Sequence, residues 1–139
     1  MSHIIDELTA FYREFNTASL SKIKAIYDED ARFSDPIHEI QGIESIERYF
    51  SSVMAGVTTC RFDFDRVTEM EGQAFLQWRM RFLHPRLAKH EICVKGISVI
   101  EFKEKVIAHV DYYDVGEMLY EHIPLVGRVI RRLKRRLSE

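Results

Sequence analysis

The sequence predicts one α+β domain, in which three N-terminal helices pack on one face of a curved, mostly antiparallel sheet. Apolar residues recur at helical spacing through the first third of the chain, and from Thr58 onward they alternate with polar residues. The length of 139 residues suits a single core of ordinary size. Near its end the chain returns to helical spacing, which predicts an additional C-terminal amphipathic helix.

The N-terminal third predicts three helices and one short strand. The first helix carries its apolar stripe on Ile4, Ile5, Leu8, Phe11, Tyr12 and Phe15. A second, short helix over residues 20–27 is capped by Ser19, and residues 31–35 then form a strand that Pro36 ends. A loop through Gly42 leads into a third helix, whose apolar face is formed by Ile43, Ile46, Tyr49, Phe50, Val53 and Met54.

Four long strands follow, because the apolar period changes to two. Residues 60–64 open the first strand, and a tight turn at Glu71 and Gly72 leads to the second. Alternation turns one set of side chains of the second strand inward: Ala74, Leu76, Trp78, Met80 and Phe82. On the third strand, one face is formed by Ile92, Val94, Gly96, Ser98 and Ile100. Residues 106–115 form the last strand.

Charge and composition exclude several classes of protein. The first 116 residues hold fourteen bases and nineteen acids, and an acidic body is untypical of a nucleic-acid binder. Two separated cysteines, Cys60 and Cys93, predict neither a disulfide framework nor a Cys-based zinc site and suit a cytoplasmic protein. We also expect no metal-binding His pair, no phosphate-binding glycine loop, no membrane span and no signal peptide.

The charge asymmetry divides the chain into a domain over residues 1–116 and a basic helical extension over residues 117–139. One face of the extension is formed by Leu125, Val126, Val129, Ile130, Leu133 and Leu137, and arginines fill the other. The simplest interpretation is a helix docked on the domain with its cationic face in solvent. The alternatives are weak contact with an anionic membrane, or closure of a cavity mouth or a dimer interface.

Two segments resemble the NTF2-like, or SnoaL-like, superfamily: Ala31-Arg32-Phe33-Ser34-Asp35-Pro36 and the final strand His109-Val110-Asp111-Tyr112-Tyr113-Asp114. The resemblance covers about residues 3–116, and the tail is similar to that of a bacterial subfamily. The superfamily includes ketosteroid isomerase, limonene epoxide hydrolase, scytalone dehydratase and polyketide cyclases. The resemblance therefore implies a cone of helices and sheet around a cavity, in a fold that hosts enzymes and binding modules alike.

The resemblance also implies site residues. Asp35 falls where ketosteroid isomerase keeps its proton-shuttling aspartate, whereas Phe11 and Ser98 fall on its oxyanion-hole tyrosine and its protonated aspartate. Asp111 falls on a catalytic aspartate of limonene epoxide hydrolase and on the acid/base aspartate of SnoaL-type cyclases. The Arg-x-Asp of the epoxide hydrolase is replaced here by Arg79-Met80-Arg81.

The last strand supplies the main candidates. Because side chains alternate along a strand, His109, Asp111 and Tyr113 share the face that the resemblance turns toward the cavity. A carboxylate in an apolar pocket loses hydration, which suits acid/base chemistry near neutral pH. We predict Asp111 as the main catalytic acid/base, assisted by His109 and Asp35. The alternatives are an ion pair between Asp111 and an arginine of the neighbouring strand, and a turn-forming role for Asp35.

The predicted substrate-binding residues are Tyr113, Phe33, Ser98, Trp78, Arg79 and Phe11. Arg79 is ambiguous, because alternation turns it outward whereas the epoxide-hydrolase comparison turns it inward against Asp111. A bulge in the strand would reconcile the two.

The sequence thus predicts a protein that binds a small, mostly apolar molecule in a conical cavity, without a metal or cofactor. Acid/base catalysis of the isomerase, dehydratase, cyclase or hydrolase type is one outcome. The alternative is a non-catalytic ligand-binding or protein-interaction module. The apolar outer face of the sheet, with Ile97, Val99, Val110 and Tyr112, predicts a homodimer.

Overall fold

The computed structural model describes residues 2–119, 122 and 124–138. Its helices are α1 (His3–Arg13), the 3-10 helix η1 (Thr17–Lys22), α2 (Ile23–Ile26), α3 (Ile43–Gly56), α4 (Val115–Met118) and α5 (Pro124–Leu137). Its strands are β1 (Tyr27–Ser34), β2 (Glu39–Gln41), β3 (Thr59–Met70), β4 (Gln73–Leu83), β5 (Ile92–Phe102) and β6 (Val106–Tyr113). The predicted α+β order is confirmed, with helices first, then a meander of long strands and a C-terminal helix.

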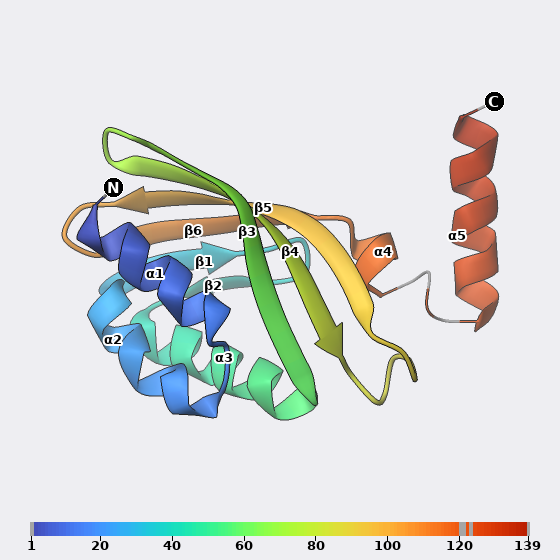
Figure 1. The fold of residues 1–139 in the computed structure, drawn as a ribbon, viewed down its shortest axis with the longest axis horizontal. Helices are drawn as coiled ribbons and strands as arrows, with labels where there is room; N and C mark the ends of the chain where they lie inside the picture. The colour runs from blue at the N-terminus through green and yellow to red at the C-terminus, as the bar shows by residue number, and fades with distance from the viewer. Residues whose placement is uncertain (1, 120–121, 123, 139) are drawn as a thin grey trace.

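One sheet holds the strands in the order β2-β1-β6-β5-β4-β3. Neighbouring strands are antiparallel, except for β1 and β6, which run parallel. Figure 1 shows α1, α2 and α3 grouped on one side of the sheet, where the long strands β3 and β4 curve around them. These helices therefore cover the concave side and leave the other side of the sheet without their cover.

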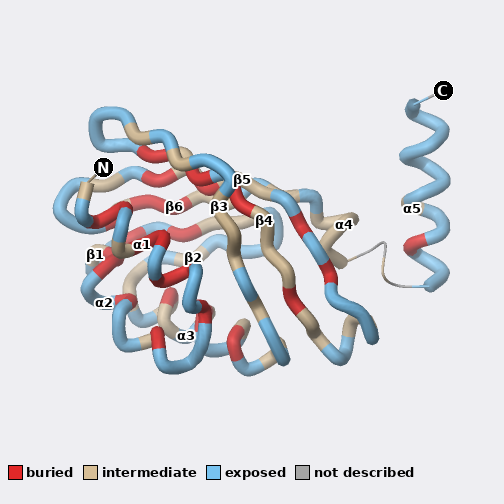
Figure 2. The backbone as a smooth tube through the Cα atoms, in the orientation of Figure 1, coloured by how far each residue is buried: buried red, intermediate tan, exposed pale blue. Residues whose placement is uncertain are grey.

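The core lies between the helices and the concave side of the sheet. Figure 2 shows buried residues in the helices and along the strands of the domain, whereas α5 is exposed over most of its length. The predicted inward faces of two strands are confirmed, because they are buried at Ala74, Leu76, Trp78 and Phe82 of β4 and at Ile92, Val94, Ser98 and Ile100 of β5. Alternation alone therefore fixed which side chains of the sheet face the helices.

The second predicted helix is divided into η1 and α2, and its predicted cap is wrong. The cap is Asn16, whose Oδ1 accepts the backbone N–H of Ala18 at 2.9 Å. Ser19 lies inside η1, and its hydroxyl donates to the backbone oxygen of Glu14. Asn and Ser are both favoured at this position, so the residue types did not distinguish them.

Strand β2 replaces part of the predicted loop before Gly42. It pairs with the end of β1, with Ile40 opposite Phe33. Only Ile40 of its three residues is half-buried, so no apolar alternation marks the strand. Gly42 follows with a φ of +92°, a left-handed conformation that glycine adopts without strain and that turns the chain into α3. Strand β1 also starts earlier than predicted, at Tyr27.

The C-terminal helix forms as predicted and starts at Pro124, a residue favoured in the first turn of a helix. Most of its apolar stripe does not pack on the domain, because Leu125, Val126, Val129, Leu133 and Leu137 are exposed. Only part of the predicted docking is therefore seen in the single chain: Ile130 is half-buried near Gly116, and Lys134 pairs with Asp114. Among the described residues, no helix is long and apolar enough to cross a membrane.

The outer face of the sheet carries apolar side chains outside the helical cover. Ile97, Val99 and Val110 are half-buried there, and Tyr112 is 58% exposed. We expect two copies of the chain to associate through this face about a two-fold axis, since an exposed apolar sheet face marks an interface.

The substitution Tyr112→Lys places a charge on an exposed apolar side chain of β6, one of the two central strands of the sheet. It should shift the mass measured by light scattering from dimer toward monomer. Met70→Lys changes a side chain of similar exposure (62%) at the end of β3 and should leave the dimer intact. A wild-type protein that is monomeric at high micromolar concentration would contradict the expectation.

Candidate functional site

A cavity of about 250 Å³ lies between the helices and the concave side of the sheet. Its lining is mainly apolar and aromatic, with Phe33, Phe50, Phe62, Trp78, Met80 and Phe82 among its residues. Two carboxylates, Asp35 and Asp111, enter this lining. Among the described residues, no lysine or arginine lines the cavity, so a cationic or neutral ligand suits it better than an anionic one.

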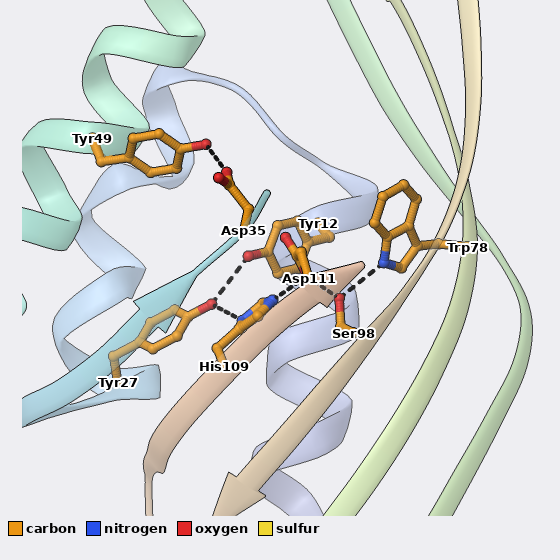
Figure 3. Close-up of polar contacts among 8 residues, drawn as sticks. All are labelled: Tyr12, Tyr27, Asp35, Tyr49, Trp78, Ser98, His109 and Asp111. Carbon is orange, nitrogen blue, oxygen red and sulfur yellow. Dashed lines mark hydrogen bonds and ion pairs between the residues drawn. The ribbon is translucent and has the colours of Figure 1, made fainter. Parts of the chain in front are cut away.

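Asp111 is held by hydrogen bonds to one of its two carboxylate oxygens. The register of β5 and β6 sets Ser98 opposite Asp111, and the Ser98 hydroxyl donates to Oδ1 at 2.5 Å. Nε2 of His109, two residues earlier on the same face of β6, lies 2.7 Å from the same oxygen. Within the described part of the chain Oδ2 has no partner, so it remains available to a molecule in the cavity (Figure 3).

Behind Asp111, a buried chain of hydrogen bonds continues into the core. Nδ1 of His109 lies 2.8 Å from the hydroxyl of Tyr27, which lies 3.0 Å from the hydroxyl of Tyr12. An ionised carboxylate only accepts, so the proton of a neutral His109 is on Nε2, and Nδ1 accepts from Tyr27. Tyr12 then donates to Tyr27, so these three side chains are linked in one series of hydrogen bonds. This series fixes the orientation of His109 and, through it, that of Asp111.

The indole of Trp78 fixes the other donor to Asp111. Its Nε1–H donates to Oγ of Ser98 at 2.8 Å, which leaves the hydroxyl proton of Ser98 for Asp111. The ring lies directly over Gly96, the residue paired with it across β4 and β5. A Cβ at Gly96 would meet the ring at 2.3 Å, so only glycine leaves room for this position.

Asp35 forms the predicted turn and also lies in the lining of the cavity. Its Oδ1 accepts the backbone N–H groups of Ile37 at 2.8 Å and of His38 at 2.6 Å, which is the turn-forming role. Its Oδ2 accepts the hydroxyl of Tyr49 at 2.9 Å on the side of the cavity (Figure 3). The side chain is only 2% exposed, so these donors replace the water that the carboxylate loses.

Four tyrosine hydroxyls surround the two carboxylates and remain protonated. Burial raises the pKa of Tyr12, Tyr27, Tyr49 and Tyr113, and the charge of Asp111 raises each pKa further. The charge of Asp35 also raises the pKa of Tyr49 and of Tyr113. Each phenol is therefore a neutral hydrogen-bond donor across the ordinary pH range.

Most of the predicted site residues line the cavity. Asp111, Asp35, Tyr113, Phe33 and Trp78 all do so. His109 and Ser98 lie behind Asp111 and contact the cavity only through it.

Two predicted placements are wrong. Arg79 does not contact Asp111: its guanidinium donates to Asp65 of β3 at 2.8 and 3.0 Å on the outer side of the sheet. Strand β4 has no bulge against β5 at this position, so alternation decides the direction of the side chain. Phe11 is fully buried among Tyr12, Phe15 and Phe50 and does not reach the cavity.

The sequence interpretation missed the roles of Tyr12, Tyr27 and Tyr49. It counted them among the apolar faces of the helices, where their rings do pack. The signal was the choice of tyrosine over phenylalanine at two buried positions and one half-buried position, because a hydroxyl that loses water almost always has a hydrogen-bond partner. The partners lie far away in sequence, so their identity required the structure.

No group of three or more His, Cys, Asp or Glu side chains in the described residues is arranged to hold a metal ion. Cys60 lines the cavity, but burial raises the pKa of its thiol to about 12, which keeps it protonated and unreactive. The chemistry that the site offers is proton transfer by carboxylates and hydrogen bonding by neutral phenols.

The comparison with protein families matches residues 8–110 to the SnoaL-like domain. Since the match spans most of the chain, the protein belongs to this family, and the predicted resemblance is confirmed. A comparison with curated proteins finds no match.

Solved structures share the fold at low sequence identity. An NTF2-like protein of unknown function from Burkholderia pseudomallei is 17% identical, with a TM-score of 0.74 over 85% of this chain and 95% of that one. A putative SnoaL-like polyketide cyclase from Shewanella putrefaciens is 15% identical, with a TM-score of 0.72 over 85% and 94%. An LEH-like epoxide hydrolase from M. tuberculosis is 15% identical, with a TM-score of 0.71 over 92% and 96%. The fold is thus shared by proteins of different activities.

The raised pKa values of the phenols predict alkaline unfolding. A group whose pKa is raised by folding stabilises the folded state fully below its unfolded pKa, which is about 10 for tyrosine, and loses this contribution as pH rises further. We expect Tyr12, Tyr27, Tyr49 and Tyr113 to ionise only as the chain unfolds. Phenolate absorbance and far-ultraviolet circular dichroism, followed in one titration, should change together for these groups. Ionisation of all tyrosines in a chain of intact dichroism would contradict this.

The contact between Trp78 and Gly96 predicts a second sensitive position. Gly96→Ala forces the indole to move, and we expect a loss of about 1–3 kcal/mol from overpacking. Trp78 is the only tryptophan of the chain, so its emission spectrum reports the displacement directly. Lys95→Ala, at the neighbouring exposed position of β5, is the control and should change neither stability nor emission. Unchanged emission in Gly96→Ala would show that the ring does not lie over this glycine.

Proposed function

We propose that the protein binds a small, mostly apolar molecule in this cavity and catalyses a proton transfer on it, with Asp111 as the acid/base. One observation supports this most strongly: Oδ1 of Asp111 accepts two hydrogen bonds, whereas Oδ2 faces an apolar cavity and has no partner among the described residues. A carboxylate with a purely structural role would have both oxygens satisfied. The reaction type is isomerisation, dehydration, cyclisation or hydrolysis, all of which proceed by proton transfer without a cofactor.

Each polar group has a role in this proposal. Asp111 accepts a proton from the ligand, or from a water beside it, and later returns it. His109 and Ser98 hold the carboxyl group in one orientation and stabilise its charge before the first transfer and after the second. The hydroxyl of Tyr113 is kept neutral by its raised pKa, to which a hydrogen bond to Asp35 contributes. In this proposal it exchanges that bond for one to an oxygen of the ligand as negative charge develops there. The pair of Asp35 and Tyr49 forms the second polar end of the cavity.

The cavity limits the ligand. Its volume of about 250 Å³ lies below the range of roughly 300–1,000 Å³ that is typical of sites for drug-sized molecules. A molecule of one or two rings, or a short chain, suits this space. The absence of lysine and arginine from the described lining favours a ligand without acidic groups.

A non-catalytic binding module is the second candidate. It is favoured by the state of Asp35, whose two oxygens already accept hydrogen bonds from the turn and from Tyr49. With only Asp111 available for proton transfer, the same cavity binds a ligand without changing it.

The substitution Asp111→Asn tests the catalytic role. Asparagine keeps an oxygen to accept from Ser98 and His109, so we expect a change in the free energy of unfolding of less than about 1 kcal/mol. Quenching of Trp78 emission by a bound ligand should also be retained, because the shape of the cavity is unchanged. Turnover in a panel of small epoxides, unsaturated ketones and β-hydroxy carbonyl compounds should be lost.

Two further variants complete this test. Asp111→Ala leaves the donors of Ser98 and His109 unpaired and should cost about 1–3 kcal/mol, which separates the structural from the chemical contribution of the carboxylate. Asp65→Asn, on the outer side of the sheet, is the control for a lost negative charge. If Asp111→Asn turns over the panel at the wild-type rate, Asp111 is not the acid/base. If the wild type binds but converts nothing, the binding module is the better description.

A further inference from the structure

The C-terminal helix α5 presents an apolar stripe to solvent. Along this stripe Leu125 is 74%, Val129 53%, Leu133 52% and Leu137 88% exposed. The helix contacts the domain near α4, where Lys134 pairs with Asp114 at 2.8 Å and a methyl of Ile130 lies close to Gly116. Figure 1 shows α5 at the end of the molecule, beyond α4. Apart from Ile130, the stripe is therefore directed away from the core of its own chain.

An exposed stripe of this size requires a partner. An isolated helix of 14 residues is marginal in water, and helices of this length are stabilised mainly by the packing of an apolar face. The sequence nevertheless places apolar residues at strict helical spacing over four turns, which has no use on a helix surrounded by water.

The charge of α5 identifies the partner. Residues 124–137 contain six bases, Arg128, Arg131, Arg132, Lys134, Arg135 and Arg136, and no acid. Two copies of α5 packed by their apolar stripes would bring twelve positive charges together, whereas paired helices normally place opposite charges beside the seam. On the outer face of the sheet, the two carboxylates of β3, Asp63 and Asp65, already pair with arginines. An anionic lipid surface attracts the bases of α5 electrostatically and also buries the apolar side chains of its stripe.

We propose that α5 binds the surface of an anionic lipid bilayer and lies in its interface. The apolar stripe enters the boundary between headgroups and acyl chains, and the bases along its borders contact lipid phosphates and carboxylates. The helix is about 21 Å long at 1.5 Å per residue and lies along the surface instead of crossing it. This interaction does not depend on the catalytic role of Asp111.

The attachment of α5 brings the cavity close to this surface. Asp114, the partner of Lys134, also caps α4 by accepting the backbone N–H of Glu117 at 3.2 Å. The last residue of α4, Met118, lines the cavity. A bilayer bound by α5 therefore lies beside the segment that closes one part of the cavity, where an apolar ligand dissolved in the lipid can reach it.

Co-sedimentation of the full chain with vesicles tests the proposal. The probes are vesicles of pure phosphatidylcholine and of phosphatidylcholine mixed with phosphatidylserine. We expect binding to the mixed vesicles only, and its loss as salt shortens the Debye length from about 10 Å at 0.1 M to about 3 Å at 1 M. Neutralising Arg132, Arg135 and Arg136 to glutamine should weaken binding on the order of a hundred-fold, at roughly five-fold per base.

Matched variants separate a specific surface from general charge. Neutralising Arg66, Lys89 and Lys103, three exposed bases of the domain, removes the same charge and should leave vesicle binding unchanged. Leu133→Gln combined with Leu137→Gln should weaken binding about as strongly as the loss of the three arginines, without lowering the melting temperature of the domain. Asp111→Asn should bind vesicles like the wild type, so failure of the catalytic proposal is distinguished from failure of this one.

Three outcomes would overturn the proposal. The first is equal binding to both kinds of vesicle, and the second is equal weakening by the two sets of neutralised bases. The third is a change in mass by light scattering in the leucine variant with unchanged vesicle binding, because the stripe would then be covered by a second copy of the chain.

Discussion

One oxygen atom, Oδ1 of Asp111, connects the core of this protein to its cavity. It accepts from Ser98 on one side and from His109 on the other, and each of these donors is itself held by a buried aromatic residue. Removing the carboxylate would leave two buried donors without an acceptor, each at a cost of about 1–3 kcal/mol. The network therefore depends on the carboxylate, and the position of the carboxylate depends on the register of β5 and β6.

The hydroxyl groups around the cavity also stabilise two carboxylates that have lost water. Asp35 and Asp111 lie in one apolar cavity, where desolvation penalises both charges. The protein surrounds them with hydroxyls that have raised pKa values and therefore donate without adding a charge of their own. A positive partner such as Arg79 would neutralise the carboxylates more strongly, but it would also bind them in an ion pair. Keeping the cationic side chains of β4 on the outer side of the sheet leaves Oδ2 of Asp111 available.

The parts of the fold and site that the sequence predicted are those with a local period. Alternation along β4 directed Trp78 to the concave side, and alternation along β6 placed Asp111 and Tyr113 on one face, because the period of a strand does not depend on its neighbours. The resemblance to the superfamily, and not the period, indicated that this face of β6 is the cavity side. The hydrogen bond between Tyr27 and His109 could not be predicted in this way, since the two residues are 82 positions apart and meet only where β1 and β6 form the parallel pair of the sheet. Strand β2 was missed for a related reason, because it is defined by its pairing with β1 and not by burial.

The domain and the tail depart from ordinary patterning in opposite ways. The domain holds ionisable groups among apolar side chains, and the tail holds apolar side chains in water. Local choices in a folded protein usually agree with one another, and disagreement tends to mark function. At the cavity, a charged group among apolar side chains is accounted for if a ligand is the hydrogen-bond partner of Oδ2 of Asp111. At α5, apolar side chains in water are accounted for if a surface that is both apolar and anionic covers the helix. Helix α4 connects the two sites, because Asp114 at its start pairs with Lys134 of α5 and Met118 at its end lines the cavity.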